Sequence, residues 1–213
     1  MSKPSKAHMG AAKQLLRYLA GTTYFSIVYK RGSFRLSAFS DANWDNNPDN
    51  GKSTSAYLVM LSKAPISFKS GIQSLTAIST VEAELVASAL TMKEAVFCSN
   101  MMSELGFGQQ FGQVPLYIDN TATFHVLGNP AFSSRTKHIA LRYFYIRELL
   151  IVTEGAISIH YIPTDLQLAD IETKFLNKHR LRFLIERSRN LGSKFYNSIR
   201  INVYADIRSV ILW

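Results

Sequence analysis

Three strand-like segments in a row, followed at once by a helix, constrain the fold of this chain more than any other feature. Apolar and polar residues alternate over Phe34–Asp41, and two further segments typical of strands are Ala56–Ser62 and Ile66–Phe68. Only Lys63–Pro65 separates the last two, which predicts a short turn between them. Together the three segments predict an antiparallel meander.

Capping patterns predict where two helices begin. Ser79 is placed to cap a helix that runs to about Glu104, and Glu82 is placed to reach back and complete a capping box. A last helix is predicted to open at Thr164, with Gln167 placed for a second capping box. The long helix therefore follows directly on the meander.

Strands and helices alternate in the second half of the chain. Val114–Ile118 predicts a fourth strand, and a short helix follows through Leu127. Leu141–Val152 has a helical pattern, and Ala156–Ile162 predicts a fifth strand before the last helix. The order β-β-β-α-β-α-α-β-α indicates an α/β fold with a mixed sheet.

Acidic residues fall at the ends of two predicted strands. Asp41 ends the first strand and Asp119 follows the fourth, while a glutamate of the long helix and Asp170 of the last helix lie in helix turns. Ligands of open α/β sheets bind outside the strand ends, so these acids could converge. Converging carboxylates repel one another unless hard cations such as Mg²⁺ or Mn²⁺ lie between them.

Two such ions, about 3.5 to 4 Å apart, can activate a water and stabilise the leaving oxygen of a phosphodiester. The pattern therefore predicts a metal-dependent phosphoryl-transfer site. Ordinary solvated acids explain the same pattern, because 15 Asp and Glu residues will often fall at strand ends in a chain of 213 residues.

The charge balance favours an anionic partner. The chain has 24 Lys and Arg against 15 Asp and Glu, a net charge of +9, which points to nucleic acid first and a membrane surface second. Solubility alone explains such an excess equally well. Six basic residues lie in or near the last helix, where they either bind phosphate or form a solvated face: Lys174, Lys178, Arg180, Arg182, Arg187 and Arg189.

Several classes of protein are excluded. A single cysteine, Cys98, cannot form an internal disulfide framework, and no Cys/His group has zinc spacing. The N-terminus lacks an apolar signal segment, and no run of about 18 apolar residues is present. An intracellular chain without a membrane partner is expected.

Seven short motifs, in order along the chain, carry a resemblance to a known family. They are Ser40–Trp44, Lys52–Ser55, Gln73–Ser74, Thr80–Glu84, Tyr117–Asn120, Arg135–Ile139 and Gln167–Ile171. Together they resemble the ribonuclease H domain that ends the Pol polyprotein of copia-type LTR retrotransposons, especially those of plants. The resemblance runs from about Met9 to Leu191.

The resemblance implies a ribonuclease H-like α/β fold, with a five-stranded mixed sheet, strands one to three antiparallel, and flanking helices. It also implies hydrolysis of the RNA strand of RNA–DNA hybrids with two Mg²⁺ ions, or Mn²⁺ as a substitute. Carried over by position, the catalytic and metal-binding acids are Asp41, Glu84, Asp119 and Asp170. Glu82 points about 200° away from Glu84 on a helix, so both cannot face the metals.

Seven further residues are expected to contact the substrate: Lys52, Ser53, Thr54, Asn120, Arg135, Lys137 and His138. Residues 52–54 are suited to a phosphate or a ribose 2′-OH, although an ordinary turn into the second strand explains them as well. Asn120 also fits an N-cap, which is the better interpretation of that residue. His138 fits either a nucleic-acid backbone contact or a hydrogen bond at a helix entry.

The resemblance also divides the chain. Residues 1–30 resemble the connection that follows a polymerase, with an adjunct helix over residues 8–20; residues 31–191 form the ribonuclease H-like domain, and residues 192–213 are an unassigned tail. No polymerase, integrase or protease motif occurs, which predicts a fragment or stand-alone derivative of a polyprotein. Its expected partners are RNA–DNA hybrids and the reverse-transcriptase and integrase portions, in the cytoplasm (a virus-like particle) or the nucleus.

This chain departs from the family pattern at several positions. Asn43 stands where the family usually has a second aspartate, and Glu172 and Phe175 replace the Phe and Pro of the typical Phe-Thr-Lys-Pro-Leu motif. None of these changes removes a predicted metal ligand. They indicate a drifted copy, so the alternative function is a catalytically silent module that binds nucleic acid or a protein partner.

Overall fold

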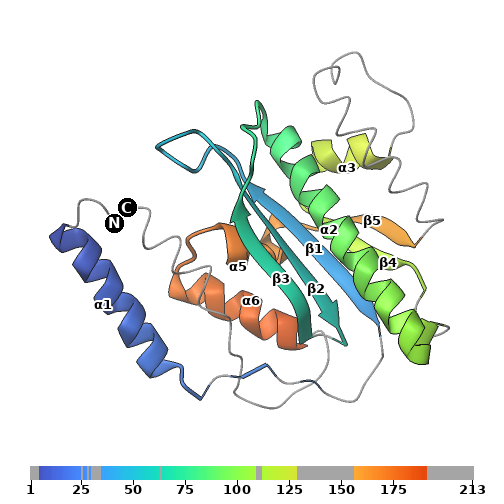
Figure 1. Ribbon diagram of the computed structural model, residues 1–213, viewed down its shortest axis with the longest axis horizontal. Coiled ribbons are helices and arrows are strands. Elements are labelled where there is room, and N and C mark those ends of the chain that lie inside the picture. The colour runs from blue at the N-terminus through green and yellow to red at the C-terminus, as the bar shows by residue number, and fades with distance from the viewer. Residues whose placement is uncertain are drawn as a thin grey trace.

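The computed structural model describes residues 5–24, 26–27, 29, 35–62, 64–108, 112–128 and 156–190. Within these ranges five strands form one sheet in the order β3-β2-β1-β4-β5 (Figure 1). The strands are β1 Leu36–Asn43, β2 Thr54–Leu61, β3 Ala64–Ile72, β4 Val114–Ile118 and β5 Ile157–Tyr161. The predicted helix at Leu141–Val152 and the tail at 192–213 lie outside the described residues.

Helices α2 Thr80–Met102, α3 Thr121–Gly128 and α6 Lys178–Asn190 flank this sheet, and α1 Lys6–Gly21 precedes it in the chain. Shorter turns are the π-helical η1 Ser103–Phe107, the 3₁₀ turn η4 Thr164–Leu166 and the single-turn α5 Asp170–Thr173. No helix in the described ranges is long and apolar enough to cross a membrane.

The sheet is mixed, as the sequence predicts. β1 pairs antiparallel with β2, and β2 with β3, whereas β1–β4 and β4–β5 are parallel. Ala38 of β1 lies opposite Leu116 of β4. Parallel strands end at the same edge, so the C-terminal ends of β1 and β4 lie together.

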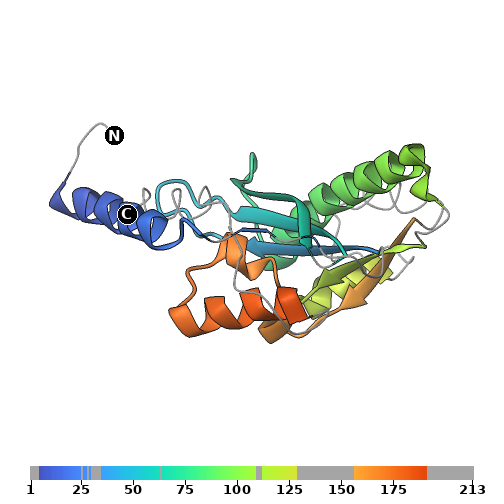
Figure 2. The same ribbon diagram turned by 90° about the horizontal axis from the view of Figure 1, so that it is seen from below.

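The two faces of the sheet carry separate apolar clusters. Adjacent residues of a strand point to opposite faces, so Ala38 packs with Leu85 and Met92 of α2, while Phe39 packs with Leu184 of α6 on the other side. Figure 2 shows the sheet nearly edge-on, with α2 and α6 on opposite sides. α1 lies apart at one end, and none of its residues is buried.

The start of α2 confirms Ser79 as the N-cap, but Glu82 does not bond to the backbone N–H of Ser79 as the predicted capping box requires. The Ser79 hydroxyl accepts the backbone N–H of Glu82 at 3.2 Å. Glu82 Oε2, however, accepts the N–H of Ile78 at 2.8 Å, one residue before the cap. The helix ends at Met102 and passes into η1, where Gly106 has a φ of 88°.

The predicted last helix is wrong in detail, because the chain forms η4, α5 and α6 in its place. Gln167 does not cap Thr164. Its fully buried Nε2 donates to the carbonyls of Ser40 in β1, at 2.9 Å, and Tyr117 in β4, at 3.4 Å. Its Oε1 accepts the N–H of Ala169 at 3.3 Å. A buried amide that needs partners therefore overrides the local capping pattern.

Replacing Gln167 by Leu should lower the free energy of unfolding by about 1–3 kcal/mol, because the buried Ala169 N–H then loses its acceptor and two carbonyls lose a donor. Urea unfolding monitored by circular dichroism measures this change. The matched control is Gln14→Leu on α1, where the side chain is exposed and the expected change is below about 0.5 kcal/mol. Equal effects at the two positions would contradict the anchoring role of Gln167.

Candidate active site

Three predicted acids meet at the common edge of β1 and β4. Asp41 is near the end of β1, Asp119 follows β4 directly, and Asp170 begins α5. One carboxylate oxygen of each lies within 4.8 Å of the others. Asp41 and Asp170 are only 1% and 2% exposed, while Asp119 is half-buried.

Glu84, the fourth predicted acid, approaches this group from α2. Its side chain is buried and accepts a hydrogen bond from the backbone N–H of Ala42, beside Asp41. Burial raises the pKa of Glu84 well above its ordinary value, and the charges of Asp41 and Asp119 raise it further. Glu84 Oε2 finds no hydrogen-bond partner among the described residues.

Two cations and a hydroxyl contact the buried aspartates. Lys174 Nζ lies 2.6 Å from Asp170 Oδ1 and 3.1 Å from Asp41 Oδ1, and Arg180 Nη2 lies 3.3 Å from Asp170 Oδ2. The Thr173 hydroxyl donates to Asp41 Oδ2. Burial lowers the pKa of Lys174, but the two aspartates outweigh burial and hold this pKa well above its ordinary value.

These contacts do not fully compensate the burial of Asp41. Burial raises the pKa of Asp41 to about 6, against the opposing effects of the Lys174 charge and the Thr173 hydrogen bond. The charges of Asp170 and Asp119 add to the rise. In the absence of a metal ion, the ionised form of Asp41 is therefore disfavoured at its position.

The donor set fits a divalent metal ion. Asp41, Asp119 and Asp170 form a group whose oxygens could hold one ion, and Mg²⁺ and Mn²⁺ prefer oxygen ligands. Glu84 lies outside this group, but its Oε2 is a buried acceptor with no partner in the described part of the chain. A cation between the acids would favour their ionised forms, which burial and mutual repulsion oppose. Asp41, Glu84, Asp119 and Asp170 are the residues that would hold it.

Lys52, Ser53 and Thr54 lie in the loop between β1 and β2 and at the start of β2, beside the end of β1. Lys52 Nζ donates to the Ser74 carbonyl at 2.9 Å, and the buried Ser53 hydroxyl accepts the N–H of Asp45 at 3.2 Å. The Thr54 hydroxyl bonds to an asparagine of the same loop. All three residues thus help to hold this loop.

The remaining predicted substrate contacts divide into two groups. Asn120 Oδ1 accepts the N–H of Thr123 at 2.9 Å, which is the N-cap that the sequence favours for this residue. Arg135, Lys137 and His138 lie outside the described residues.

Two basic side chains, those of Lys174 and Arg180, point toward the acids. The sequence groups Lys174 and Arg180 with the other basic residues near the last helix, whereas the structure places both against the acids. Lys174 follows Asp170 by four residues, a spacing that brings two side chains together on a helix. The spacing thus indicates the contact of Lys174, whereas no local pattern indicates that of Arg180.

Comparison with known proteins identifies relatives over most of the chain. No protein-family model matches. The chain is 39% identical over 180 residues to the retrovirus-related Pol polyprotein from transposon RE2 of Arabidopsis thaliana, covering 84% of this chain and 12% of the relative. It is 33% identical over 186 residues to that from transposon TNT 1-94 of Nicotiana tabacum, covering 87% of this chain and 14% of the relative.

The fold has solved counterparts. The structure of LC11-RNase H1, isolated from compost, aligns with a TM-score of 0.50 and 12% sequence identity, covering 75% of this chain and 99% of that chain. The likeness shows a shared fold, which confirms the ribonuclease H-like fold predicted from the sequence.

The stability of the metal-free protein should depend on Asp41. A carboxyl with a higher pKa in the folded chain binds its proton more tightly there, so this contribution to stability is lost as the pH rises from 3.8 through about 6. Asp41→Asn removes that loss. The variant should therefore gain stability relative to the wild type across this interval, as measured by urea unfolding with a chelator present.

The exposed Asp49, changed to Asn, controls for the removal of one acidic residue. A difference between Asp41→Asn and wild type that stays constant from pH 4 to pH 6, or that falls, would contradict the pKa assigned to Asp41.

Proposed function

Because the chain belongs to the retrovirus-related Pol polyproteins of copia-type plant retrotransposons, we propose that it hydrolyses the RNA strand of RNA–DNA hybrids with two Mg²⁺ ions. The observation that carries this proposal is the convergence of Asp41, Asp119 and Asp170, with the buried Glu84 beside them, at one edge of the sheet. Such a cluster of carboxylates suits metal-assisted phosphoryl transfer.

In this proposal the four acids hold the ions, with Mn²⁺ as a substitute. When bound, two divalent ions supply Lewis acidity for the attacking water and for the leaving oxygen. The protein contributes orientation: the Thr173 hydroxyl fixes one oxygen of Asp41, and Arg180 contacts one oxygen of Asp170. Gln167 ties the segment before Asp170 to β1 and β4.

Substrate contacts are proposed for the loop beside Asp41. An ammonium has three donors, so Lys52 can bond a phosphate oxygen while it keeps the Ser74 carbonyl. The partly exposed Thr54 hydroxyl is proposed to contact a ribose 2′-OH, the group that distinguishes RNA from DNA, while the fully buried Ser53 supports the loop beneath it. The proposal retains Asn120 as a contact through its amide nitrogen, and Arg135, Lys137 and His138 as contacts to the nucleic-acid backbone.

The biological setting follows from the relatives. The chain spans about an eighth of the length of the Pol polyproteins it matches. We propose that the reaction accompanies reverse transcription beside the reverse-transcriptase and integrase portions of such a polyprotein, in the cytoplasm or the nucleus.

Asp119→Asn should reduce Mg²⁺-dependent cleavage of an RNA–DNA hybrid by more than about a hundredfold while hybrid binding persists, because a metal ligand is lost but the surface is kept. Glu84→Gln should act in the same direction. Single-turnover cleavage of a labelled hybrid, with duplex DNA and duplex RNA as comparison substrates, measures the effect, and a chelator should abolish it.

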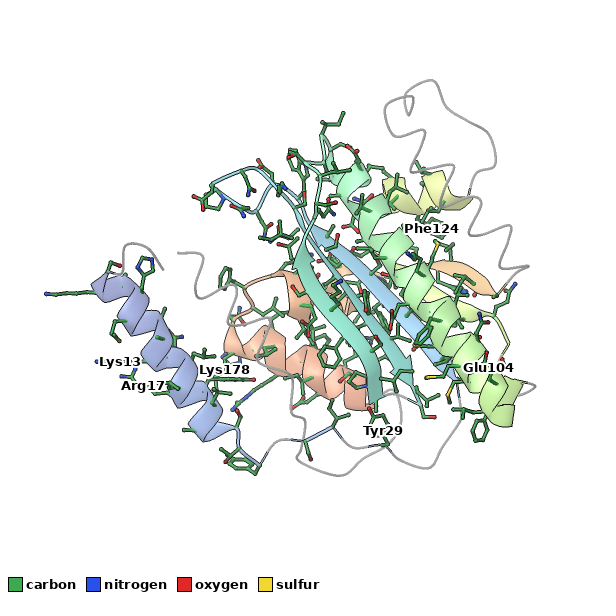
Figure 3. All side chains as sticks on the ribbon, viewed as in Figure 1. Lys13, Arg17, Tyr29, Glu104, Phe124 and Lys178 are labelled. Atoms are coloured by element: carbon green, nitrogen blue, oxygen red, sulfur yellow. The ribbon has the colours of Figure 1, made fainter. Side chains whose placement is uncertain are left out.

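The matched controls are Asp49→Asn and Glu104→Gln, two exposed acids. Glu104 lies beyond the end of α2 that is far from Glu84 (Figure 3). Cleavage that survives Asp119→Asn would overturn the proposed chemistry. Wild-type protein that binds the hybrid in Mg²⁺ without cleaving it would favour the silent binding module, for which the ammonium of Lys174 among the acids is the supporting observation.

A further inference from the structure

Lys174 places a cation among the carboxylates that the proposed function assigns to metal ions. It follows α5 directly, and its backbone N–H donates to the Asp170 carbonyl at 3.0 Å. Its side chain then returns over the turn, so that one ammonium bridges Asp41 and Asp170. The side chain is 33% exposed, so Lys174 covers the two buried aspartates from the solvent side.

Every oxygen of the two buried aspartates has a partner. The Thr173 hydroxyl donates to Oδ2 of Asp41, and the Arg180 guanidinium donates to Oδ2 of Asp170. The Lys174 ammonium donates to Oδ1 of both aspartates. An ion that bridges Asp41 Oδ1 and Asp170 Oδ1 would need the position of the Lys174 ammonium, which lies 3.1 Å and 2.6 Å from these two atoms.

Lys174 is the group that can leave most readily. Arg180 also donates to the backbone carbonyls of Thr164, at 2.7 Å, and Asp165, at 2.6 Å, so its guanidinium is held on two sides. Thr173 has a short side chain within α5. Lys174 has a long flexible stem, and its ammonium bonds to the two aspartates alone among the described residues.

We propose that Lys174 is an internal counter-ion of the acidic site: it holds Asp41 and Asp170 together in the metal-free protein and competes with divalent metal ions for the same oxygens. This inference rests on the proposed metal-dependent function. Metal binding then requires the Lys174 ammonium to leave the site. The chain therefore binds metal ions more weakly than the same four acids would without Lys174.

The coupling has a definite sign. An ammonium and a metal ion that both bridge Asp41 Oδ1 and Asp170 Oδ1 compete for one position and repel each other, so removal of the ammonium favours the metal. Removal also leaves the two aspartates with only Thr173 and Arg180 as partners in the metal-free protein, which destabilises that state and again favours the metal-bound one. Both effects tighten metal binding.

The test measures Mn²⁺ binding by electron paramagnetic resonance of the free ion, on the full chain without nucleic acid. Lys174→Met should bind Mn²⁺ about five- to tenfold more tightly than the wild type, the range of a modest coupling between two ligands. Lys174→Arg keeps the charge and should stay near the wild-type affinity. Lys93→Met, a change of an exposed lysine on α2, should leave the affinity unchanged.

A second readout is the thermal unfolding midpoint with and without Mg²⁺. Lys174→Met should have a lower midpoint without metal and a larger rise on addition of Mg²⁺ than the wild type. If Lys174→Met does not fold, Lys174→Gln replaces it, because an amide can still donate to the aspartates without carrying a charge. An unchanged or weaker affinity for Mn²⁺ in the neutral variants overturns the proposal.

The outcomes also separate this inference from the proposed function. If Asp119→Asn weakens Mn²⁺ binding but the neutral Lys174 variants match the wild type, the metal site stands and the counter-ion role fails. If only the neutral variants bind Mn²⁺, the counter-ion role stands and the wild-type chain is the silent form. If no variant binds Mn²⁺ in an Asp119-dependent way, both fail.

Discussion

The parallel pairing of β1 with β4 is the constraint on which the site depends. Asp41 and Asp119 are 78 positions apart in the chain, yet each lies at the C-terminal end of its strand, and parallel neighbours bring those ends to one edge. Antiparallel pairing would put the two carboxylates at opposite edges. The remaining contacts, from Glu84 on α2 and Asp170 on α5, add to an edge that the strand order has already defined.

That edge concentrates negative charge where water is largely excluded, and the protein compensates it from one short stretch of chain. Thr173, Lys174 and Arg180 lie within ten residues after Asp170. Their contacts with Asp41 and Asp170 limit the electrostatic cost, although the raised pKa of Asp41 indicates that some of the cost remains. The metal ions proposed for this site would use the same oxygens as these stabilising contacts.

The sequence predicts the features that follow from local patterns. Alternation in the strands predicts the mixed sheet, and the structure confirms both the sheet and the Ser79 cap. The position of acids at strand ends predicts that Asp41, Asp119 and Asp170 converge, as they do. Family resemblance, rather than periodicity, selected Glu84 over Glu82. The role of Gln167 was not predictable, because its partners Ser40 and Tyr117 are distant in sequence and a buried amide can satisfy itself in many ways.

Asp170 and Lys174 stand one helical turn apart on the same short element, α5 and its first following residue. A rigid movement of α5 therefore carries the acid and its ammonium together and cannot separate them. Rotation about side-chain bonds, of Lys174 or of Asp170, is what opens that pair. In the counter-ion role proposed for Lys174, a change of its rotamer uncovers these oxygens, and such rotations are among the fastest conformational changes in a folded protein.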